Sequence, residues 1–444
     1  MYGRMPGKGL FVMDIKHSEI YGGKLRLHTL ATDRFKMSRF SINFIVNSDA
    51  RYSPLYKLML AVMMRGSEKY PTITEINRAL DDRYDTTVAY TNTRVGDKSV
   101  YKISCKLLKN KYVFEGDNTR ILDEVLEIVS DILFHPVKDE NGLLRSELVE
   151  SEKKIEIDNI NAKINDPKAY ASEQCSRIMF KGSKFEVYGG NIGLVESFTP
   201  AELTDGIRKF FEECRVECFY VGDESHERIL SLVKRNFPFS CDFDKSITFA
   251  ESMLECNRAE QYIEEEYDVS QARLALGYRC GTVLSDDDYY AMALFNEIFG
   301  GGSASKLFMN VREKKSLCYY CYSSLHSASG TLKVGCGIDP SKKDEAMSEI
   351  AEQLNAMKRG DISESELETA KRTVIAGLRQ INDSPAAIEA YSFRRMLAGV
   401  DETPEEICTK ISAITKEEVI KAARKVVLDT VYFMNGCGED EYDE

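Results

Sequence analysis

Histidine is scarce in this sequence of 444 residues, and zinc-peptidase patterns built on it are absent. The five histidines are His17, His28, His135, His226 and His326. No two of them lie four residues apart, so no helix face offers a pair of imidazoles to a metal ion. Neither His-Glu-x-x-His nor His-x-x-Glu-His occurs. A helix-borne zinc site is therefore excluded, whereas a site assembled from distant residues stays open.

Long apolar runs and a basic excess are also missing. No apolar run exceeds seven residues, the length of Leu58–Met64, and a membrane-spanning helix needs about 20. Acidic residues outnumber basic residues by 72 to 59, for a formal net charge of −13. We therefore expect neither nucleic acid nor a membrane as a partner. No apolar core follows Met1–Lys8, so we expect no signal peptide and a cytoplasmic location.

The cysteines do not form a secreted disulfide pattern. Twelve of them are spread from Cys105 to Cys437, whereas disulfide frameworks are usually shorter and denser. We therefore expect reduced thiols. Cys318 and Cys321 have C-x-x-C spacing, but a structural zinc site normally needs a second pair, and cysteines such as Cys336 occur singly. Packed core thiols are favoured, and an enzyme site around Cys318 and Cys321 remains an alternative.

An internal repeat is the main organising feature. Phe198–Gly222 and Ile414–Gly436 share one pattern, at an offset of 216 residues in the helical part and 214 in the strand part. Ile164–Asp166 and Ile381–Asp383 match at an offset of 217. Three matches at nearly one offset indicate two copies of one fold.

The repeated segments have clear local signals. Thr199–Glu202 and Thr415–Glu418 are capping boxes, each beginning a helix that leads into a short apolar strand. Helices and strands come in groups, which predicts an α+β fold of two similar domains, each a mostly antiparallel sheet flanked by helices. We expect an N-terminal domain over 1–236, a linker over 237–257 and a C-terminal domain over 258–444.

The segment Phe299–Ser324 resembles the C-terminal domain of the insulinase (pitrilysin) metallopeptidase family. In that family a Gly-rich turn precedes a helix ending in Arg-Glu-x-x-x-Leu-x-Tyr, and the corresponding residues here are Arg312, Glu313, Leu317 and Tyr319. The resemblance implies that Arg312 and Tyr319 hold the substrate and the developing oxyanion at a zinc site in another domain or chain. It also implies that the turn shapes the adjacent substrate-binding wall, through Gly300, Gly301 and Gly302.

The resemblance extends to the N-terminal half, where the zinc ligands are replaced. Gly66–Pro71 is similar to the segment that follows the family's zinc helix. Counting back places Lys57 and Ala61 at the imidazole positions and Leu60 at the general base, and Asn159 falls where the ligand glutamate is expected. Leucine and alanine neither hold zinc nor activate water. We expect no metal in this chain and no independent hydrolysis.

The resemblance implies a function in a pair. The chain is expected to be a catalytically degenerate, non-zinc subunit of a heterodimeric zinc metallopeptidase, with Arg312 and Tyr319 acting in trans at the partner's active site. Its expected partners are a homologous zinc-binding peptidase subunit and a peptide substrate. The alternative is a non-proteolytic structural or peptide-binding protein of the same fold.

Overall fold

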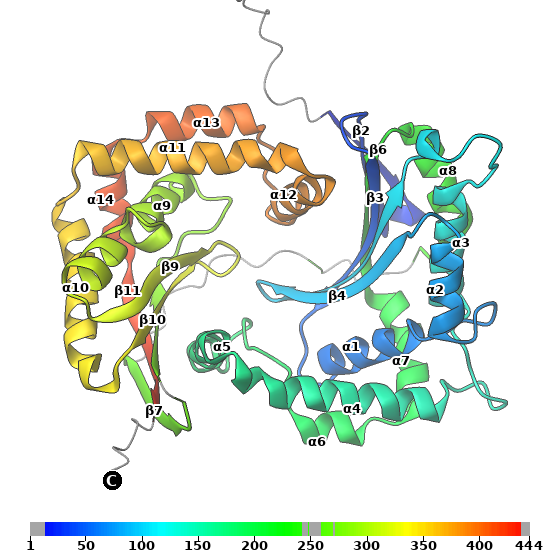
Figure 1. Cartoon of the computed structure of the whole chain (residues 1–444), viewed down its shortest axis with the longest axis horizontal. Coiled ribbons are helices and arrows are strands. Elements are labelled where there is room, and N and C mark those ends of the chain that lie inside the picture. Colours follow the sequence, from blue (N-terminus) through cyan, green and yellow to red (C-terminus); the bar gives the residue numbers. More distant parts are fainter. Residues whose placement is uncertain (1–13, 242–246, 248–258, 270, 437–444) are drawn as a thin grey trace, which may run out of the picture.

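The computed structural model describes residues 14–241, 247, 259–269 and 271–436, and its strands form two sheets (Figure 1). The first sheet has the order β1-β2-β6-β3-β5-β4 and the second has the order β7-β11-β8-β10-β9. The strands of the first half (residues 14–241) are β1 (Ile15–Ile20), β2 (Leu25–Ala31), β3 (Met37–Asn47), β4 (Thr87–Val95), β5 (Lys98–Leu108) and β6 (Arg215–Gly222). Those of the second half (residues 259–436) are β7 (Gln261–Tyr267), β8 (Ala272–Arg279), β9 (Cys318–His326), β10 (Thr331–Ile338) and β11 (Val427–Gly436).

Apart from β1, the two sheets have the same strand order and the same strand directions. β2 pairs with β6 in parallel, and β7 pairs with β11 in parallel. The other neighbouring strands in both sheets are antiparallel. The predicted fold of two similar units with mostly antiparallel sheets is confirmed.

Each sheet carries a set of helices. The first half contains α1 (Tyr52–Met63), α2 (Ile73–Asp81), α3 (Ile121–Phe134), α4 (Ser146–Ala162), α5 (Pro167–Phe180), α6 (Ile192–Ser197), α7 (Pro200–Glu213) and α8 (His226–Asn236). The second contains α9 (Tyr289–Asn296), the π-helices η4 (Glu297–Gly301) and η5 (Leu307–Lys314), α10 (Lys343–Arg359), α11 (Glu364–Gln380), α12 (Pro385–Leu397), α13 (Pro404–Ala413) and α14 (Lys416–Lys425). Short 3₁₀ turns are η1 (Tyr21–Gly23), η2 (Asn110–Tyr112), η3 (Lys163–Asn165), η6 (Pro340–Lys342) and η7 (Ile381–Asp383).

The repeated helices begin as their sequences predict. Thr199 and Thr415 are the N-caps of α7 and α14, and each side chain accepts a hydrogen bond from the backbone of the glutamate three residues later. Each helix then leads directly into a buried strand, β6 or β11, in the middle of its sheet. Capping of this kind fixes where a helix begins and so sets the connection to the following strand.

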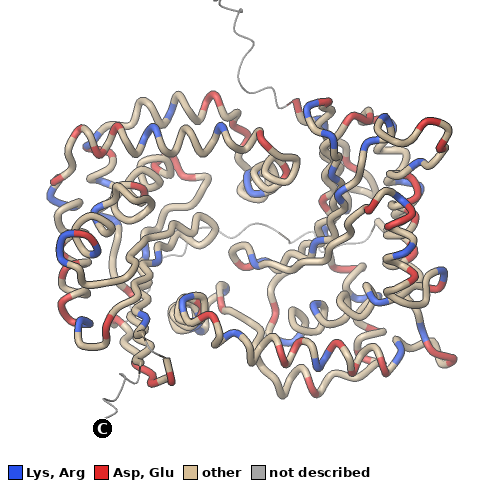
Figure 2. The backbone as a smooth tube through the Cα atoms, viewed as in Figure 1, with Lys and Arg blue, Asp and Glu red and all other residues tan. Residues whose placement is uncertain are grey.

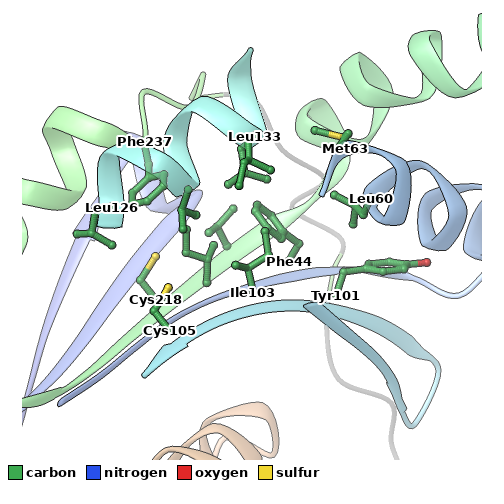
Figure 3. Packing of buried hydrophobic residues seen from close by; sticks show 14 of the residues in the cluster. Phe44, Leu60, Met63, Tyr101, Ile103, Cys105, Leu126, Leu133, Cys218 and Phe237 are labelled. Atoms are coloured by element: carbon green, nitrogen blue, oxygen red, sulfur yellow. The ribbon is translucent and has the colours of Figure 1, made fainter. Parts of the chain in front are cut away.

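The core of the first half lies between its sheet and the helices on one face. Phe44 and Ile103 point from β3 and β5 toward Leu126 and Leu133 of α3 (Figure 3). Phe237, the first residue of the predicted linker, packs in the same core. The remainder of that predicted linker falls largely outside the described residues.

The two halves exchange a helix. α5 belongs by sequence to the first half but contacts β8, β10 and β11 of the second sheet. α12 belongs to the second half and contacts β3 and β6 of the first sheet. Figure 1 shows α5 near the second sheet and α12 near the first. The matching 3₁₀ turns η3 and η7, which precede these helices, contain the repeat at Ile164 and Ile381.

One predicted element differs from the structure. The sequence suggests a helix over Asp286–Phe299 that ends at the following glycines, but α9 begins at Tyr289 and continues as the π-helix η4 through Gly301. A β-carbon at Gly300 would lie 2.6 Å from the Ser323 backbone nitrogen. The missing side chain lets the π-turn pack directly on β9, so Gly300 continues the helical turn instead of ending it.

Candidate functional site

The segment predicted to replace the zinc motif lies on α1, which packs beside α4. Lys57 makes an ion pair of 2.6 Å with Glu156 of α4. Leu60 is 1% exposed and lies in the core near Phe44 and Tyr101 (Figure 3). The turn that would hold a general base has therefore become part of the hydrophobic core.

The other two positions predicted to replace zinc ligands, Ala61 and Asn159, do not supply strong metal ligands. Ala61 has no donor atom, and Asn159 is exposed on α4. A neutral amide is a weak metal ligand compared with a carboxylate or an imidazole. The α1–α4 contact is thus held by a Lys–Glu pair, and its chemistry does not fit a catalytic zinc ion.

Tyr319 occupies a β-bulge at the beginning of β9. Cys318 pairs with Ile338 of β10 and Tyr320 pairs with Gly337, so Tyr319 is an extra residue with no partner in the ladder. Its side chain is 59% exposed, and β9 is an edge strand of the second sheet. Bulges of this kind redirect side chains and often lie beside functional sites.

Arg312 lies next to this bulge, on η5. Its guanidinium carbon is 4.7 Å from the centroid of the Phe308 ring, and its Nε is 3.6 Å from the Glu313 carboxylate. Its side chain is 41% exposed. The structure therefore places a cation and a phenol on adjacent elements, with neither side chain packed into the core of its own half.

The three glycines have a packing role that sequence reasoning did not assign. Gly300 is buried against β9, whereas β-carbons at Gly301 and Gly302 would lie 2.6 Å and 2.8 Å from the carboxylate of Glu297. Burial raises the pKa of that carboxyl group. Close packing against the β9 backbone explains the absence of a side chain at Gly300, whereas the Glu297 side chain could move away from a β-carbon at Gly301 or Gly302. Contact of the three glycines with substrate stays a prediction.

The bulge also creates a cluster of cysteines. Residues three apart on a regular strand face opposite sides, but the extra residue places Cys318 on the same face as Cys321. Cys321 pairs directly with Cys336 of β10, and the three sulfur atoms lie within 4.8 Å of one another. Among the residues that the structure describes, this is the one group of three possible metal ligands found together.

The environment of Cys318 favours its thiolate. Hydrogen bonds with Cys321 and Cys336, together with the nearby Arg312 guanidinium, hold the pKa of the Cys318 thiol well below its usual range. Sequence reasoning treated Cys336 as single because its contribution depends on the register of the β9–β10 hairpin. The strand-like alternation of apolar and polar residues along Thr331–Ile338 was the signal that could have placed Cys336 on a strand.

Comparison with a family model supports the resemblance found in the sequence. Residues 197–374 match the family model described as the peptidase M16 inactive domain. This confirms the resemblance to the insulinase (pitrilysin) metallopeptidases, and the match covers less than half of the chain.

Individual relatives agree with that resemblance. The chain is 29% identical over 420 residues to the probable inactive metalloprotease YmfF of Bacillus subtilis (strain 168), covering 93% of this chain and 96% of that protein. It is 24% identical to the uncharacterized zinc protease YmxG of the same organism, covering 69% of this chain and 74% of that protein.

Solved structures share the fold. A conserved protein from Enterococcus faecalis V583 superposes with a TM-score of 0.88 at 24% identity, covering 96% of this chain and all of that chain. A peptidase M16 inactive domain from Pseudomonas fluorescens gives a TM-score of 0.76 at 17% identity, covering 96% and 98%. Within the described residues, none of the helices combines the length and the apolar character needed to cross a membrane.

Proposed function

We propose that this chain is the non-zinc subunit of a heterodimeric zinc metallopeptidase. In this proposal Arg312 and Tyr319 reach the active site of a homologous partner, which holds the zinc ion and the general base. The chain itself supplies no catalytic metal. Peptide hydrolysis takes place at the partner's zinc, with this chain binding the substrate and part of the developing charge.

The exposure of Tyr319 on its bulge is the observation that carries the proposal. Tyrosine is enriched at protein interfaces, because its ring packs on apolar groups while its hydroxyl meets a polar partner. Tyr319 is 59% exposed on an edge strand, and Arg312 is available beside it. A phenol hydroxyl and a guanidinium are suitable donors to an oxyanion.

The residues at the α1–α4 contact also support the proposal that the partner, and not this chain, holds the zinc ion. The site where the family's zinc is expected contains an ion-paired Lys57 and a buried Leu60, and neither side chain binds zinc or activates water. Activity in such a chain has to come from another subunit. The alternative, a peptide-binding protein without proteolysis, makes no use of Arg312 and Tyr319 beside a zinc site.

Reconstitution with the zinc-bearing homologue from the same cells tests the proposal. We expect the two chains to copurify and to hydrolyse peptides, with loss of activity when a chelator removes zinc. Tyr319→Phe and Arg312→Ala should each lower kcat/KM by about 10²-fold, the usual effect of removing one oxyanion donor. Lys314→Ala is the matched control, because Lys314 is exposed on the same helix.

The result could contradict the proposal in two ways. Failure of this chain to associate with any homologue carrying His-x-x-Glu-His would favour the non-proteolytic alternative. Association with unchanged kcat/KM in both variants would remove the assigned role of Arg312 and Tyr319 while leaving the pairing intact.

A further inference from the structure

A cavity of about 910 Å³ lies between the two halves of the chain. α5 and the segment 185–188 form one side of it. The turn between β4 and β5, the β9–β10 hairpin and Arg394 of α12 form the remainder. The exchanged helices therefore build a space that neither half encloses alone.

The wall of this cavity is rich in positive charge although the chain carries a net charge of −13. It contains two carboxylates, Asp166 and Glu173, and six cationic side chains, which are Arg94, Lys163, Lys168, Arg177, Lys333 and Arg394. Figure 2 marks Lys and Arg positions on α5, near the tip of the β4–β5 hairpin and on α12.

Both carboxylates already have partners. Glu173 forms ion pairs with Lys163 at 2.7 Å and Arg177 at 2.6 Å. Asp166 accepts a hydrogen bond from the Ala169 backbone at 3.1 Å and so caps α5. Within the described part of the chain the remaining four cations, Arg94, Lys168, Lys333 and Arg394, form no ion pair.

Neutral groups hold three of these four cations in place. Lys168 Nζ lies 4.2 Å from the centroid of the Tyr322 ring. Lys333 Nζ donates to the hydroxyl oxygens of Ser172 at 3.0 Å and Ser176 at 2.9 Å. The Arg94 guanidinium carbon is 5.9 Å from the centroid of the Phe180 ring. The contacts position the cations without neutralising them.

This arrangement of cations has an energetic cost in the protein alone. The buried Nε of Arg94 has no hydrogen-bond partner. Burial lowers the pKa of Arg94 to about 10, and burial also lowers the pKa of Lys333. Asp97 and Glu186 oppose the lowering of the Arg94 pKa only in part, and a carboxylate in the cavity would offset the remaining cost of burying the cation.

We propose that this cavity binds a carboxylate-rich segment of an acidic peptide. The four cations without ion pairs would contact the carboxylates, and Phe180, Phe185 and Leu325 would contact the aliphatic parts of the peptide. The volume falls within the range of ordinary ligand pockets and suits a short segment of chain. A nucleic acid duplex is too large for it and would be repelled by the acidic molecule around it.

The cavity also adjoins the strand that carries Tyr319. Tyr322 lines the cavity three residues further along β9, a distance of roughly 10 Å along the strand. That this peptide is also the one cleaved at the partner's zinc rests on the proposed function. Binding of the peptide by the isolated chain does not rest on that function. Peptide binding in the cavity and cleavage at the partner's zinc can therefore be tested separately.

Fluorescence anisotropy with the full chain alone tests the binding. The probe is a labelled peptide of six glutamates, compared with the same peptide carrying six glutamines. We expect the glutamate peptide to bind at least tenfold more tightly and to weaken as salt is raised. Arg394→Gln and Lys168→Gln should each weaken its binding at least threefold, and both positions are exposed enough to keep the fold.

Arg208→Gln on α7 is the control, because its side chain is 76% exposed and lies away from the cavity wall. Equal binding of the two peptides would overturn the proposal. An equal loss in Arg208→Gln and Arg394→Gln would also overturn it by showing non-specific attraction. Displacement of the peptide by a lower concentration of single-stranded oligonucleotide would assign the cavity to another ligand.

A second inference rests on the cysteine cluster. We infer that Cys318, Cys321 and Cys336 form a site for a thiophilic metal ion such as Zn²⁺. Zinc bound to thiolates has sulfur atoms roughly 3.8 Å apart, so thiols within 4.8 Å need to close by about 1 Å. Cys318 is half-buried, which leaves room for water as a fourth ligand.

Metal analysis of the full, reduced chain after incubation with Zn²⁺ and dialysis tests this site. We expect one zinc ion per chain, and its loss in Cys318→Ser and in Cys321→Ser. Cys408→Ser, on α13, should keep the zinc ion. Retention of less than a tenth of an ion by the unaltered chain, or equal retention by Cys318→Ser, would overturn the inference.

Discussion

At the scale of single residues, one extra position on β9 has several consequences. The bulge at Tyr319 exposes a phenol beside Arg312 and also places Cys318 on the face of Cys321 and Cys336. A regular strand would separate these groups between two faces. The candidate substrate contacts and the thiol cluster therefore depend on the same local irregularity.

The position predicted for the replaced general base, Leu60, gives a prediction at this scale. Because Leu60 is 1% exposed, restoring a glutamate there buries a carboxylate in an apolar core. Leu60→Ala should lower the free energy of unfolding by about 2–5 kcal/mol, and Leu60→Glu should lower it further. Urea denaturation measures both, with the half-buried Ala61→His as the control. A Leu60→Glu protein as stable as the original would contradict the burial of this position in the apolar core.

At the scale of elements, the exchanged helices depend on close packing. Gly277 of β8 faces α5, and a β-carbon there would lie 2.9 Å from the Met179 sulfur and 3.2 Å from the Cys175 sulfur. α12 is held by a buried glutamate, Glu389, which forms ion pairs with Arg39 of β3 and Lys102 of β5. One helix is thus docked by shape and the other by charge.

Gly277→Ala should destabilise the protein by about 1–3 kcal/mol because α5 has to move away from β8. Gly377→Ala is the matched control: Gly377 lies inside α11 with no atom near its missing β-carbon. That change should stabilise the protein by about 1 kcal/mol through helix propensity. Urea denaturation gives both values, and a neutral Gly277→Ala would mean that α5 is not tightly docked.

Glu402 links three helices and makes stability depend on pH. It accepts hydrogen bonds from Tyr290 of α9, Arg395 of α12 and Lys410 of α13. Burial alone would raise the pKa of Glu402, but these hydrogen bonds outweigh burial and lower the pKa to about 2. The folded value lies below the ordinary value of 4.5, so this stabilisation is complete above 4.5 and is lost as the pH falls toward 2.

The melting temperature of Glu402→Gln against pH measures this link. We expect the variant to melt below the original protein at neutral pH and the difference to shrink as the pH falls below 4.5. A difference that stays constant down to the lowest pH would show that the charge of Glu402 is not what holds the helices.

The element scale also shows why sequence reasoning succeeded in some places. The capping boxes at Thr199 and Thr415 are local signals, so their helices begin where predicted. The exchange of α5 and α12 has no local signal, since an apolar helix face does not specify which sheet will cover it. The cationic cavity was missed for the same reason: its wall combines side chains from both halves.

At the scale of the whole molecule, the exchange makes each half depend on the other. Cys175 and Ala171 of α5 pack with Tyr432 and Met434 of the second sheet. Ile388 of α12 packs with residues of the first sheet. Separating the halves would expose both apolar faces to water, which opposes independent motion of the two units.

A protease site inserted between residues 241 and 259 tests this dependence. After complete cleavage, we expect the two pieces to elute together from a sizing column in native buffer, because each still covers the other's helix. Glu389→Ala should weaken the association, since it leaves Arg39 and Lys102 without their partner and breaking a buried ion pair costs about 3–5 kcal/mol. Cleaved pieces that separate at once would show that the covalent connection, and not the exchanged helices, holds the two halves around the cavity.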